Sequence, residues 1–318
     1  MTRSVHLIVN PHAGRGRARK LLPSVMAGLR AGMKDIDLQV QQTSSPTDAK
    51  ARIKSAAERL LSSDAAGDTP APALLVMGGD GMVSLGLNAV AGTPVRLGVI
   101  PAGTGNDFSR GMGLPLTPEG AVAGMVAGLE RSVDLMRVEG QLISGAHTRW
   151  VGSVLSTGYD ARVNLRTNRR SVNIGALSYG LDALVELARF EPINYRLTLD
   201  GVRRDELAMF VCVGNAGYIG GGMHICPDAD PVDGLLDVTI VHPVRRGALL
   251  RLLPRTYNGS FANDACVEQL RVSSAVVDGD TMFGMADGEE VGEVPLKCSV
   301  VPNALWLLGV KPSPVAAT

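Results

Sequence analysis

The chain has 318 residues, of which 45% are hydrophobic and 19% are charged, and its 31 basic residues equal its 31 acidic residues. A chain of this length favours two domains, because single cores usually stop growing at about 250 to 300 residues. The charge balance argues against a dedicated nucleic-acid binder, so no nucleic-acid partner is expected. Four cysteines without CxxC spacing and five scattered histidines favour isolated thiols in a reducing compartment over a disulfide framework or a zinc site.

The start of the chain does not have the pattern of a secretory signal. Met1 to Pro11 contains a short strand-like segment and no apolar core region. No apolar run reaches the roughly 18 to 20 residues that span a bilayer. We therefore expect a cytoplasmic protein without a transmembrane segment, in which any contact with a membrane must be peripheral.

Strand and helix patterns alternate over the first part of the chain. β-rich or fully apolar runs predict strands over 4–9, 38–42, 73–77 and 95–100. Good helix formers and capping residues predict helices over 17–32, 46–61, 82–90 and 118–129, with a surface loop over 62–72. Apolar strands separated by helices are typical of a parallel sheet covered on both faces, so residues 1–132 are predicted to form a three-layer α/β domain.

From about Val133 onward the pattern changes to short strands joined by turns. Strands are predicted over 133–138, 150–156, 195–199, 207–214, 236–241, 269–273 and 296–301. Four Asp-Gly pairs predict turns, at Asp200, Asp233, Asp278 and Asp287. A helix over 178–189 is the clear interruption. Residues 133–301 are therefore predicted to form a mainly antiparallel β domain, and the last ten residues a frayed tail.

Three glycine-rich segments follow three of the strands in the first domain, at 10–16, 78–81 and 101–107. In a parallel sheet these segments lie at the carboxyl ends of the strands, where such folds bind ligands. Glycine lets the backbone approach a phosphate closely and supplies N–H donors. Asp80 offers a carboxylate for magnesium or a proton. Each loop alone is also an ordinary connection, but three at one edge favour a nucleotide site, and the absence of GxxxxGK[ST] and GxGxxG disfavours the P-loop and Rossmann modes.

These loops also resemble a known family. Asn10-Pro11 with Gly14, GGDG at 78–81, and PAGTGNDF at 101–108 followed by GLP at 113–115 are similar to the signature of the diacylglycerol kinase catalytic domain. That superfamily includes bacterial diacylglycerol kinases, sphingosine kinases and ceramide kinases. PAGTGNDF is the most specific piece, because related nucleotide kinases share GGDG but not this string. Further matches extend the resemblance over residues 4–310: GGGM at 220–223, PDADPVDGL at 227–235, DGE at 287–289, Pro295 and PNAL at 302–305.

The resemblance implies a fold and a set of partners. The family has an α/β nucleotide-binding domain similar to phosphofructokinase and NAD kinase, followed by a β-sandwich domain. The end of the chain usually returns to the first domain, so 302–318 are expected there. ATP and Mg²⁺ are the implied cofactors, a lipid at a membrane surface is the implied substrate, and bacterial relatives imply a homodimer.

The matching motifs also imply which residues contact ATP. They are Asn10, Pro11, His12, Ala13, Gly14, Thr43, Gly78, Gly79, Asp80, Gly81, Met82, Val83, Ser84, Gly103, Thr104, Gly105, Asn106 and Asp107. Most family members have Thr where this chain has Met82, and Glu where it has Leu85. A hydrogen bond lost to a charged partner is worth about 1.5 to 3 kcal/mol, which points to lowered ATP affinity. Asp80 and the glycines remain, so inactivation is not implied.

Bacterial members hold a structural magnesium in a loop that corresponds here to Asp230, Asp233 and Leu235. Leu235 and Asp230 would act through their backbone carbonyls. Hard oxygen ligands at this spacing suit magnesium or calcium. Without the resemblance, the segment DPVDG is a turn and nothing more.

The family places the carboxylate that activates the acceptor in the Asp-Gly-Glu triplet. Glu289 is the candidate base, with Asp287 and Asp80 as rivals. Without the resemblance, Asp287-Gly288 is another hairpin turn and Glu289-Glu290 is a solvated pair.

The expected function is transfer of the γ-phosphate of ATP to a lipid hydroxyl, and diacylglycerol, which would give phosphatidic acid, is the favoured acceptor. Sphingoid bases, other glycerolipids and a polyprenol-like alcohol stay open as acceptors. Two alternatives stay open. One is a soluble-metabolite kinase of the NAD kinase type, which shares GGDG. The other is a nucleotide-binding regulator without catalytic activity, which Met82 and Leu85 support.

A membrane acceptor requires a docking surface. The sequence offers a basic cluster just before a helix with an apolar face: Arg162, Arg166, Arg169 and Arg170, then Leu181, Leu184, Val185 and Leu187. Basic side chains near a surface of anionic lipid gain roughly 1 kcal/mol each. The alternative is a solvated loop with ordinary surface arginines and a helix that faces the core.

Overall fold

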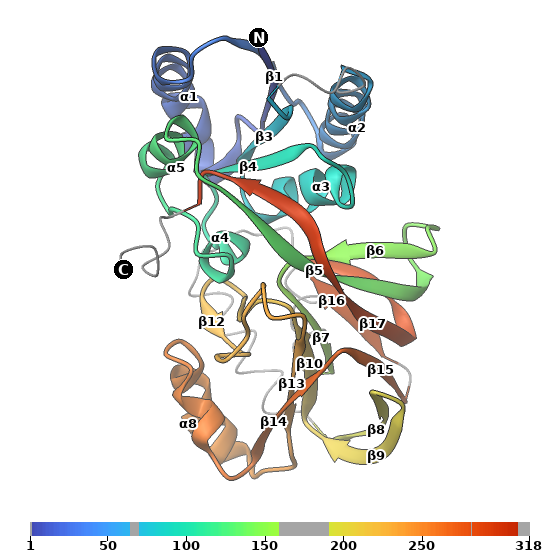
Figure 1. The fold of residues 1–318 in the computed structure, drawn as a ribbon. Helices are drawn as coiled ribbons and strands as arrows, with labels where there is room; N and C mark the ends of the chain where they lie inside the picture. The colour runs from blue at the N-terminus through green and yellow to red at the C-terminus, as the bar shows by residue number, and fades with distance from the viewer. Residues whose placement is uncertain (1, 64–69, 159–190, 281, 311–318) are drawn as a thin grey trace, which may run out of the picture. The chain divides into compact units, whose positions relative to one another are not determined.

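The computed structural model describes residues 2–63, 70–158, 191–280 and 282–310, and the chain divides into two compact units (Figure 1). Unit 1 comprises residues 1–135 and 302–318, and unit 2 comprises residues 136–301. The chain passes between the units within two long strands, β5 (Glu130–Leu142) and β17 (Glu289–Leu308). The predicted docking cluster lies outside the described residues: Arg162, Arg166, Arg169, Arg170 and the helix over 178–189.

Unit 1 contains a parallel sheet with the order β2-β1-β3-β4-β17. Its further strands are β1 (Arg3–Val9), β2 (Ile36–Gln42), β3 (Ala73–Gly78) and β4 (Arg96–Pro101). Its helices are α1 (Ala13–Gly32), α2 (Pro46–Ser63), α3 (Asp80–Val90), α4 (Asp107–Gly111) and α5 (Pro118–Val126). The final strand comes from the end of the chain, where residues 306–308 pair with 96–98 of β4.

The helices of unit 1 cover both faces of this sheet. α1 packs against α5 on one face and α2 packs against α3 on the other (Figure 1). Ala18, Leu22, Val25 and Leu29 form a buried stripe at helical spacing along α1, and all of β3 is buried. The predicted three-layer α/β class is confirmed for this part of the chain.

Unit 2 is antiparallel. One run of strands has the order β14-β13-β10-β7-β16-β17, and β17 continues through β15 and β8 to β9. The strands are β6 (Thr148–Val151), β7 (Val154–Gly158), β8 (Ile193–Leu199), β9 (Val202–Ala208), β10 (Phe210–Gly214), β11 (Tyr218–Ile219), β12 (Met223–His224), β13 (Leu236–Val241), β14 (Val267–Val272), β15 (Ser274–Gly279) and β16 (Phe283–Ala286). Apolar side chains from these strands form one buried core, so the predicted β-sandwich is confirmed.

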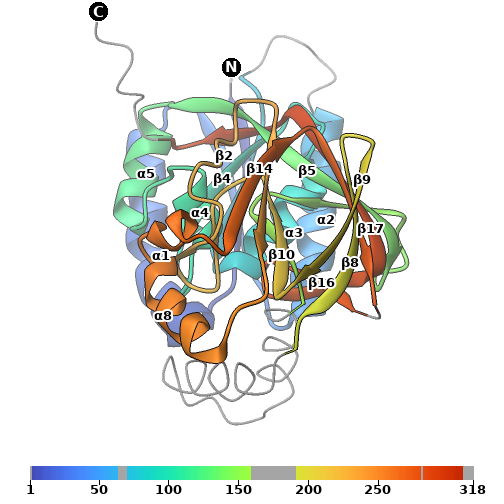
Figure 2. The same cartoon turned by 90° about the horizontal axis from the view of Figure 1, so that it is seen from below.

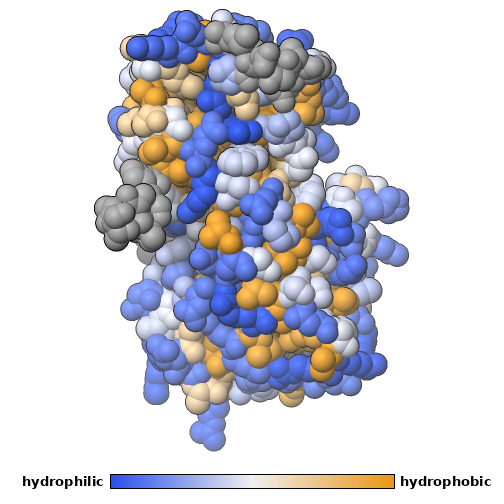
Figure 3. Space-filling view, viewed as in Figure 1, coloured by the Kyte–Doolittle hydropathy of each residue, from blue (hydrophilic) through white to orange (hydrophobic). Residues whose placement is uncertain are grey.

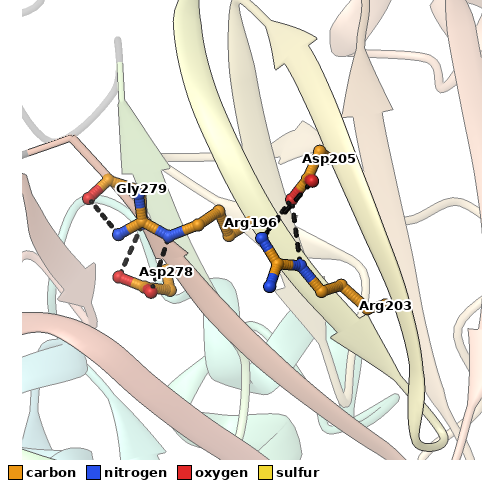
Figure 4. A network of polar contacts seen from close by, with 5 residues as sticks. All are labelled: Arg196, Arg203, Asp205, Asp278 and Gly279. Atoms are coloured by element: carbon orange, nitrogen blue, oxygen red, sulfur yellow. Dashed lines mark hydrogen bonds and ion pairs between the residues drawn. The ribbon is translucent and has the colours of Figure 1, made fainter.

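The outer strands β8, β9 and β15 carry a network of arginine and carboxylate pairs (Figure 4). Arg196 of β8 donates through Nε to Asp278 of β15 at 3.0 Å, and Arg203 of β9 pairs with Asp205 at 3.1 Å. These pairs are largely exposed, so each contributes little stability. Asp200, in the β8–β9 turn, accepts hydrogen bonds from Ser273, which hold the pKa of this carboxyl below its usual range.

Several secondary-structure predictions in unit 2 were wrong. The predicted strand 150–156 is two strands, β6 and β7, which are separated by residues 152 and 153. A helix, α8 (Arg246–Thr256), was missed, because Gly247 and Pro254 weaken its helical pattern. The predicted strand 207–214 is two strands, because the chain bends at Met209, whose N–H donates to Val241. The pair Asp278-Gly279 ends β15 rather than forming a separate turn.

The helix α8 packs against the short 3₁₀ helix η2 (Ser260–Asn263), and it lies at the opposite side of unit 2 from the β8–β9 hairpin (Figure 1 and Figure 2). Of the helices that the structure describes, none is both long and apolar enough to cross a membrane.

Candidate phosphate-binding and catalytic sites

The three glycine loops of unit 1 meet at one edge of the parallel sheet. β1, β3 and β4 are neighbours in that order, so the segments after them emerge side by side. The N–H of Asn10 donates to the carbonyl of Met77 at 2.9 Å, and the N–H of Ala102 donates to the carbonyl of Gly78 at 2.8 Å. The predicted clustering of the loops is therefore present in the structure.

Two glycines allow this close approach of the loop backbones. A Cβ on Gly14, whose φ is +58°, would lie 2.3 Å from the carbonyl oxygen of Ala102. A Cβ on Gly103 would lie 2.5 Å from the Cα of Gly79. Any side chain at Gly14 or Gly103 would push the loops apart, so the edge requires glycine at both positions.

Asp80 joins the second loop to the third. It stands in the first turn of α3, and its Oδ2 accepts the N–H of Asn106 at 2.9 Å while its Oδ1 accepts the N–H of Phe108 at 3.3 Å. Asn106 adopts the left-handed conformation, with φ of 55°, and donates from Nδ2 to the carbonyl of Gly103 at 3.3 Å. The Asp80 carboxylate thus determines the shape of the loop that the sequence marks as most specific.

The predicted ATP-contacting residues divide into two groups. Those of the loops lie at the sheet edge with at least part of their surface accessible: Asn10, Pro11, His12, Ala13, Gly14, Gly79, Asp80, Gly81, Gly103, Thr104, Gly105, Asn106 and Asp107. Gly78 is buried at the end of β3, and the other four have buried side chains: Thr43, Met82, Val83 and Ser84. The N–H groups of Met82 and Val83 already donate to Gly79. The side chains of Thr43, Met82, Val83 and Ser84 are therefore turned away from solvent at this edge, and their contact with ATP stays a prediction.

Met82 fills the space beside the second loop. Its side chain is 5% exposed, and a Cβ on Gly78 would lie 2.5 Å from its Cγ. Thr at this position would leave part of that space empty, so the departure from the family pattern changes packing as well as hydrogen bonding.

Sequence reasoning did not single out three basic residues at this edge. Arg15 and Arg17 are exposed directly after Gly14, and Arg110 of α4 donates through Nε to the carbonyl of Gly105 at 3.4 Å. Cations beside backbone N–H donors favour a polyphosphate ligand. The signal available in the sequence was the basic run that follows Gly14.

The Asp-Gly-Glu triplet of unit 2 is a hairpin. Asp287 and Gly288 connect β16 to β17 and have φ of 55° and 78°. Positive φ at both positions is what a type I′ two-residue hairpin turn requires. Glu289 follows with its side chain 58% exposed, and its Oε2 accepts a hydrogen bond from Arg149 of β6 at 3.0 Å. The Arg149 side chain is only 15% exposed, so it gives the Glu289 carboxylate a fixed cationic partner.

The predicted metal loop forms an acidic turn before β13. Asp230 Oδ1 accepts the N–H of Val232 at 3.2 Å, Asp233 Oδ1 accepts the N–H of Leu235 at 2.9 Å, and Asp233 Oδ2 pairs with Arg271. Among the residues that the structure describes, no three His, Cys, Asp or Glu side chains lie close enough together to hold a metal by themselves.

The surroundings of buried Asp237 show whether the residues of this loop suit a cation. Its side chain is 4% exposed, and its Oδ2 has no hydrogen-bond partner. Burial, followed by the charges of Asp228 and Asp230, raises the pKa of Asp237 to about 6. This excess of negative charge fits a divalent cation held by carboxylate and backbone oxygens.

Comparison with known proteins agrees with this geometry. Residues 4–138 match the diacylglycerol kinase catalytic domain, and residues 153–309 match the YegS C-terminal NAD kinase beta sandwich-like domain. A protein of Mycobacterium tuberculosis named diacylglycerol kinase is 35% identical over 306 residues, which cover 96% of this chain and 94% of that protein. A protein of Xanthomonas oryzae named "Probable lipid kinase YegS-like" is 30% identical over 73% of this chain and 77% of that protein.

Solved structures share the fold. A diacylglycerol kinase from Bacillus anthracis superposes with a TM-score of 0.72 at 22% identity, covering 98% of this chain and 97% of that one. Yeast NADH kinase has a TM-score of 0.51 at 10% identity, covering 98% of this chain and 84% of that one. The predicted family is confirmed by the domain matches and the full-length relative: the chain belongs to the diacylglycerol kinase family of lipid kinases.

Proposed function

We propose that this protein transfers the γ-phosphate of ATP to the hydroxyl of diacylglycerol and so makes phosphatidic acid. The observation that carries the proposal is the sheet edge where the three glycine loops meet. There the Asp80 carboxylate accepts hydrogen bonds from two backbone N–H groups of the PAGTGNDF segment. Such an edge presents backbone N–H groups to a polyphosphate. The name of the Mycobacterium tuberculosis relative, at 35% identity over nearly the full chain, supports diacylglycerol as the acceptor.

Each unit would contribute a separate part of the reaction. In unit 1, the loops would hold the triphosphate, with Arg15 and Arg17 near its negative charge. In unit 2, Glu289 would orient the acceptor hydroxyl and take its proton, while Arg149 keeps the carboxylate in one position. Phosphoryl transfer depends mainly on such positioning and on charge neutralisation.

Magnesium is proposed in two roles. Bound with ATP, it would neutralise charge on the phosphates. In unit 2, Asp230, Asp233 and the Leu235 carbonyl would hold a structural ion, which the unpartnered oxygen of buried Asp237 supports.

Two other functions are weighed against this proposal. The second candidate is phosphorylation of a soluble nucleotide, because this chain shares its fold with yeast NADH kinase. It ranks second because a likeness at 10% identity supports the fold alone. The regulator without catalytic activity rests on Met82 and Leu85. It is disfavoured because Asp80 and the glycines that bring the loops together are all present.

The test is phosphorylation of a lipid panel in mixed micelles with ATP and magnesium, read by mass spectrometry, with NAD offered separately as a soluble acceptor. We expect phosphorylated diacylglycerol from the wild-type protein. Glu289→Gln should lower kcat at least about a hundredfold and leave the Kd for ATP unchanged. Glu293→Gln, which changes another exposed glutamate of β17, is the matched control. Phosphorylated NAD without phosphorylated lipid would replace the proposal, and normal turnover by Glu289→Gln would remove Glu289 as the base.

A further inference from the structure

The helix α8 has one face in the core and one face in solvent. Leu249 and Leu252 are 6% and 5% exposed and belong to the buried core of unit 2. On the outer side, Leu250 is 44% exposed and Tyr257, which caps the helix, is 55% exposed. Two large apolar side chains thus stand in water one helical turn to either side of the exposed Pro254.

The charge of this segment has one sign. Residues 243–258 contain four arginines and no aspartate or glutamate. The charge of Arg255 is already paired within unit 2, because Arg255 donates to Asp264 at 2.9 Å and to the carbonyl of Ser260 at 2.6 Å. Arg245 and Arg251 are exposed and form no ion pair with any residue that the structure describes. Their charges are therefore available to an anionic partner.

The composition of this face indicates which partner it fits. Leucine and tyrosine flanked by arginine are typical of helices that lie in the interface of a bilayer, where the tyrosine ring sits at headgroup level. The helix has 11 residues and is about 16 Å long. Its outer face is far smaller than the roughly 800 Å² that each partner buries in a stable protein complex. A bilayer needs no such area or shape match, because affinity adds up from separate side chains.

We propose that α8 docks this protein on anionic membranes, with Leu250 and Tyr257 entering the interfacial layer and Arg245 and Arg251 contacting lipid phosphates. This helix is a different segment of the chain from the basic cluster at 162–170, which lies outside the described residues. Its role in delivering a lipid acceptor rests on the proposed function, whereas membrane binding itself does not.

The experiment measures co-sedimentation with vesicles of phosphatidylcholine, with and without phosphatidylglycerol, at low and high salt. The wild-type protein should bind the vesicles that contain phosphatidylglycerol, and salt should weaken the binding. Arg245→Gln and Arg251→Gln should each lower the partition coefficient about fivefold. The double variant Leu250→Ser/Tyr257→Ser should lower it at least about tenfold. Circular dichroism confirms that each variant is folded, as the exposure of the changed side chains leads us to expect.

Val202→Ser is the matched control. Val202 is 65% exposed in the β8–β9 hairpin, at the opposite side of unit 2 from α8, and its replacement should leave vesicle binding unchanged. The docking proposal is overturned if the wild-type protein does not bind vesicles, or if its binding does not depend on phosphatidylglycerol and salt. It is also overturned if the α8 variants bind vesicles as well as the wild type.

Turnover separates docking from the proposed function. A short-chain diacylglycerol dissolved as monomers should be phosphorylated equally by the wild type and by Leu250→Ser/Tyr257→Ser, whereas long-chain diacylglycerol in vesicles should be phosphorylated more slowly by the variant. If neither acceptor is phosphorylated by the wild type, the proposed function fails, and the sedimentation result still decides whether α8 docks. Equal rates on vesicles would overturn the role of α8 in acceptor delivery.

Discussion

The Asp80→Ala variant tests whether this carboxylate shapes the third glycine loop. The change removes both acceptors that hold residues 106 and 108, at 2.9 and 3.3 Å. Hydrogen bonds to a charged group are worth about 1.5 to 3 kcal/mol each, and the site is only half-buried. A further 0.3 to 1 kcal/mol, roughly, comes from losing an anion in the first turn of α3. We therefore expect local opening of the loop to become easier by about 2 to 4 kcal/mol, with weaker ATP binding.

The assay for Asp80→Ala is hydrogen exchange of the backbone amides of residues 103–108, together with ATP binding by calorimetry. Asp80→Asn, which keeps one acceptor oxygen, should fall between Asp80→Ala and the wild type. Glu58→Ala removes a carboxylate that is 65% exposed and paired only at 4.0 Å, so it should change stability by less than about 0.5 kcal/mol. Unchanged exchange at 106 and 108 in Asp80→Ala, with activity lost, would refute the positional role and leave Asp80 as a group acting on the reaction itself.

Two further predictions concern unit 1. Gly103→Ala should destabilise the fold by about 1 to 3 kcal/mol and weaken ATP binding, because its Cβ would lie 2.5 Å from the Cα of Gly79. Gly81→Ala, which meets open space in the same region, is the control, and equal effects of the two changes on urea unfolding would contradict the close-approach argument. Burial, followed by the charge of Arg59, lowers the pKa of His6 below its ordinary value, so the unfolded chain binds more protons near pH 6. Stability should fall from about pH 7.5 to pH 5.5. Thermal unfolding of the wild type and of His6→Gln across this pH range should show a smaller loss of stability in the variant. An equal loss of stability in both proteins would contradict the role given to His6.

The sequence was sufficient for the fold of unit 1, because its signals there are local and agree with one another. Fully apolar strands such as β3, helices with capping residues such as Thr117, and glycine loops after the strands all indicate a parallel sheet. Unit 2 was predicted less completely. Its strands are short, and the helix α8 is interrupted by Pro254 near its end, so tertiary packing of Leu249 and Leu252 outweighs local propensity there.

Site prediction had a similar limit. The glycine loops could be recognised from their order along the chain, whereas the orientation of individual side chains could not. GGDG is followed directly by Met82, Val83 and Ser84, yet the helix turns all three into the core. The pairing of Glu289 with Arg149 joins residues 140 positions apart, so no local pattern could have indicated it.

The geometry also bears on which carboxylate accepts the proton. Asp80 uses both oxygens to accept backbone N–H groups, and a proton on either oxygen would remove the negative charge and weaken both of these hydrogen bonds. In the proposed reaction, proton transfer to Asp80 would therefore weaken the hydrogen bonds that hold the loop while the loop binds the triphosphate. Glu289 is bonded to Arg149 through Oε2, is more than half exposed, and can take a proton on its other oxygen without disturbing a loop. The two carboxylates are thus suited to different tasks, so within the proposed function Glu289 is favoured as the base and Asp80 as the residue that shapes the third glycine loop.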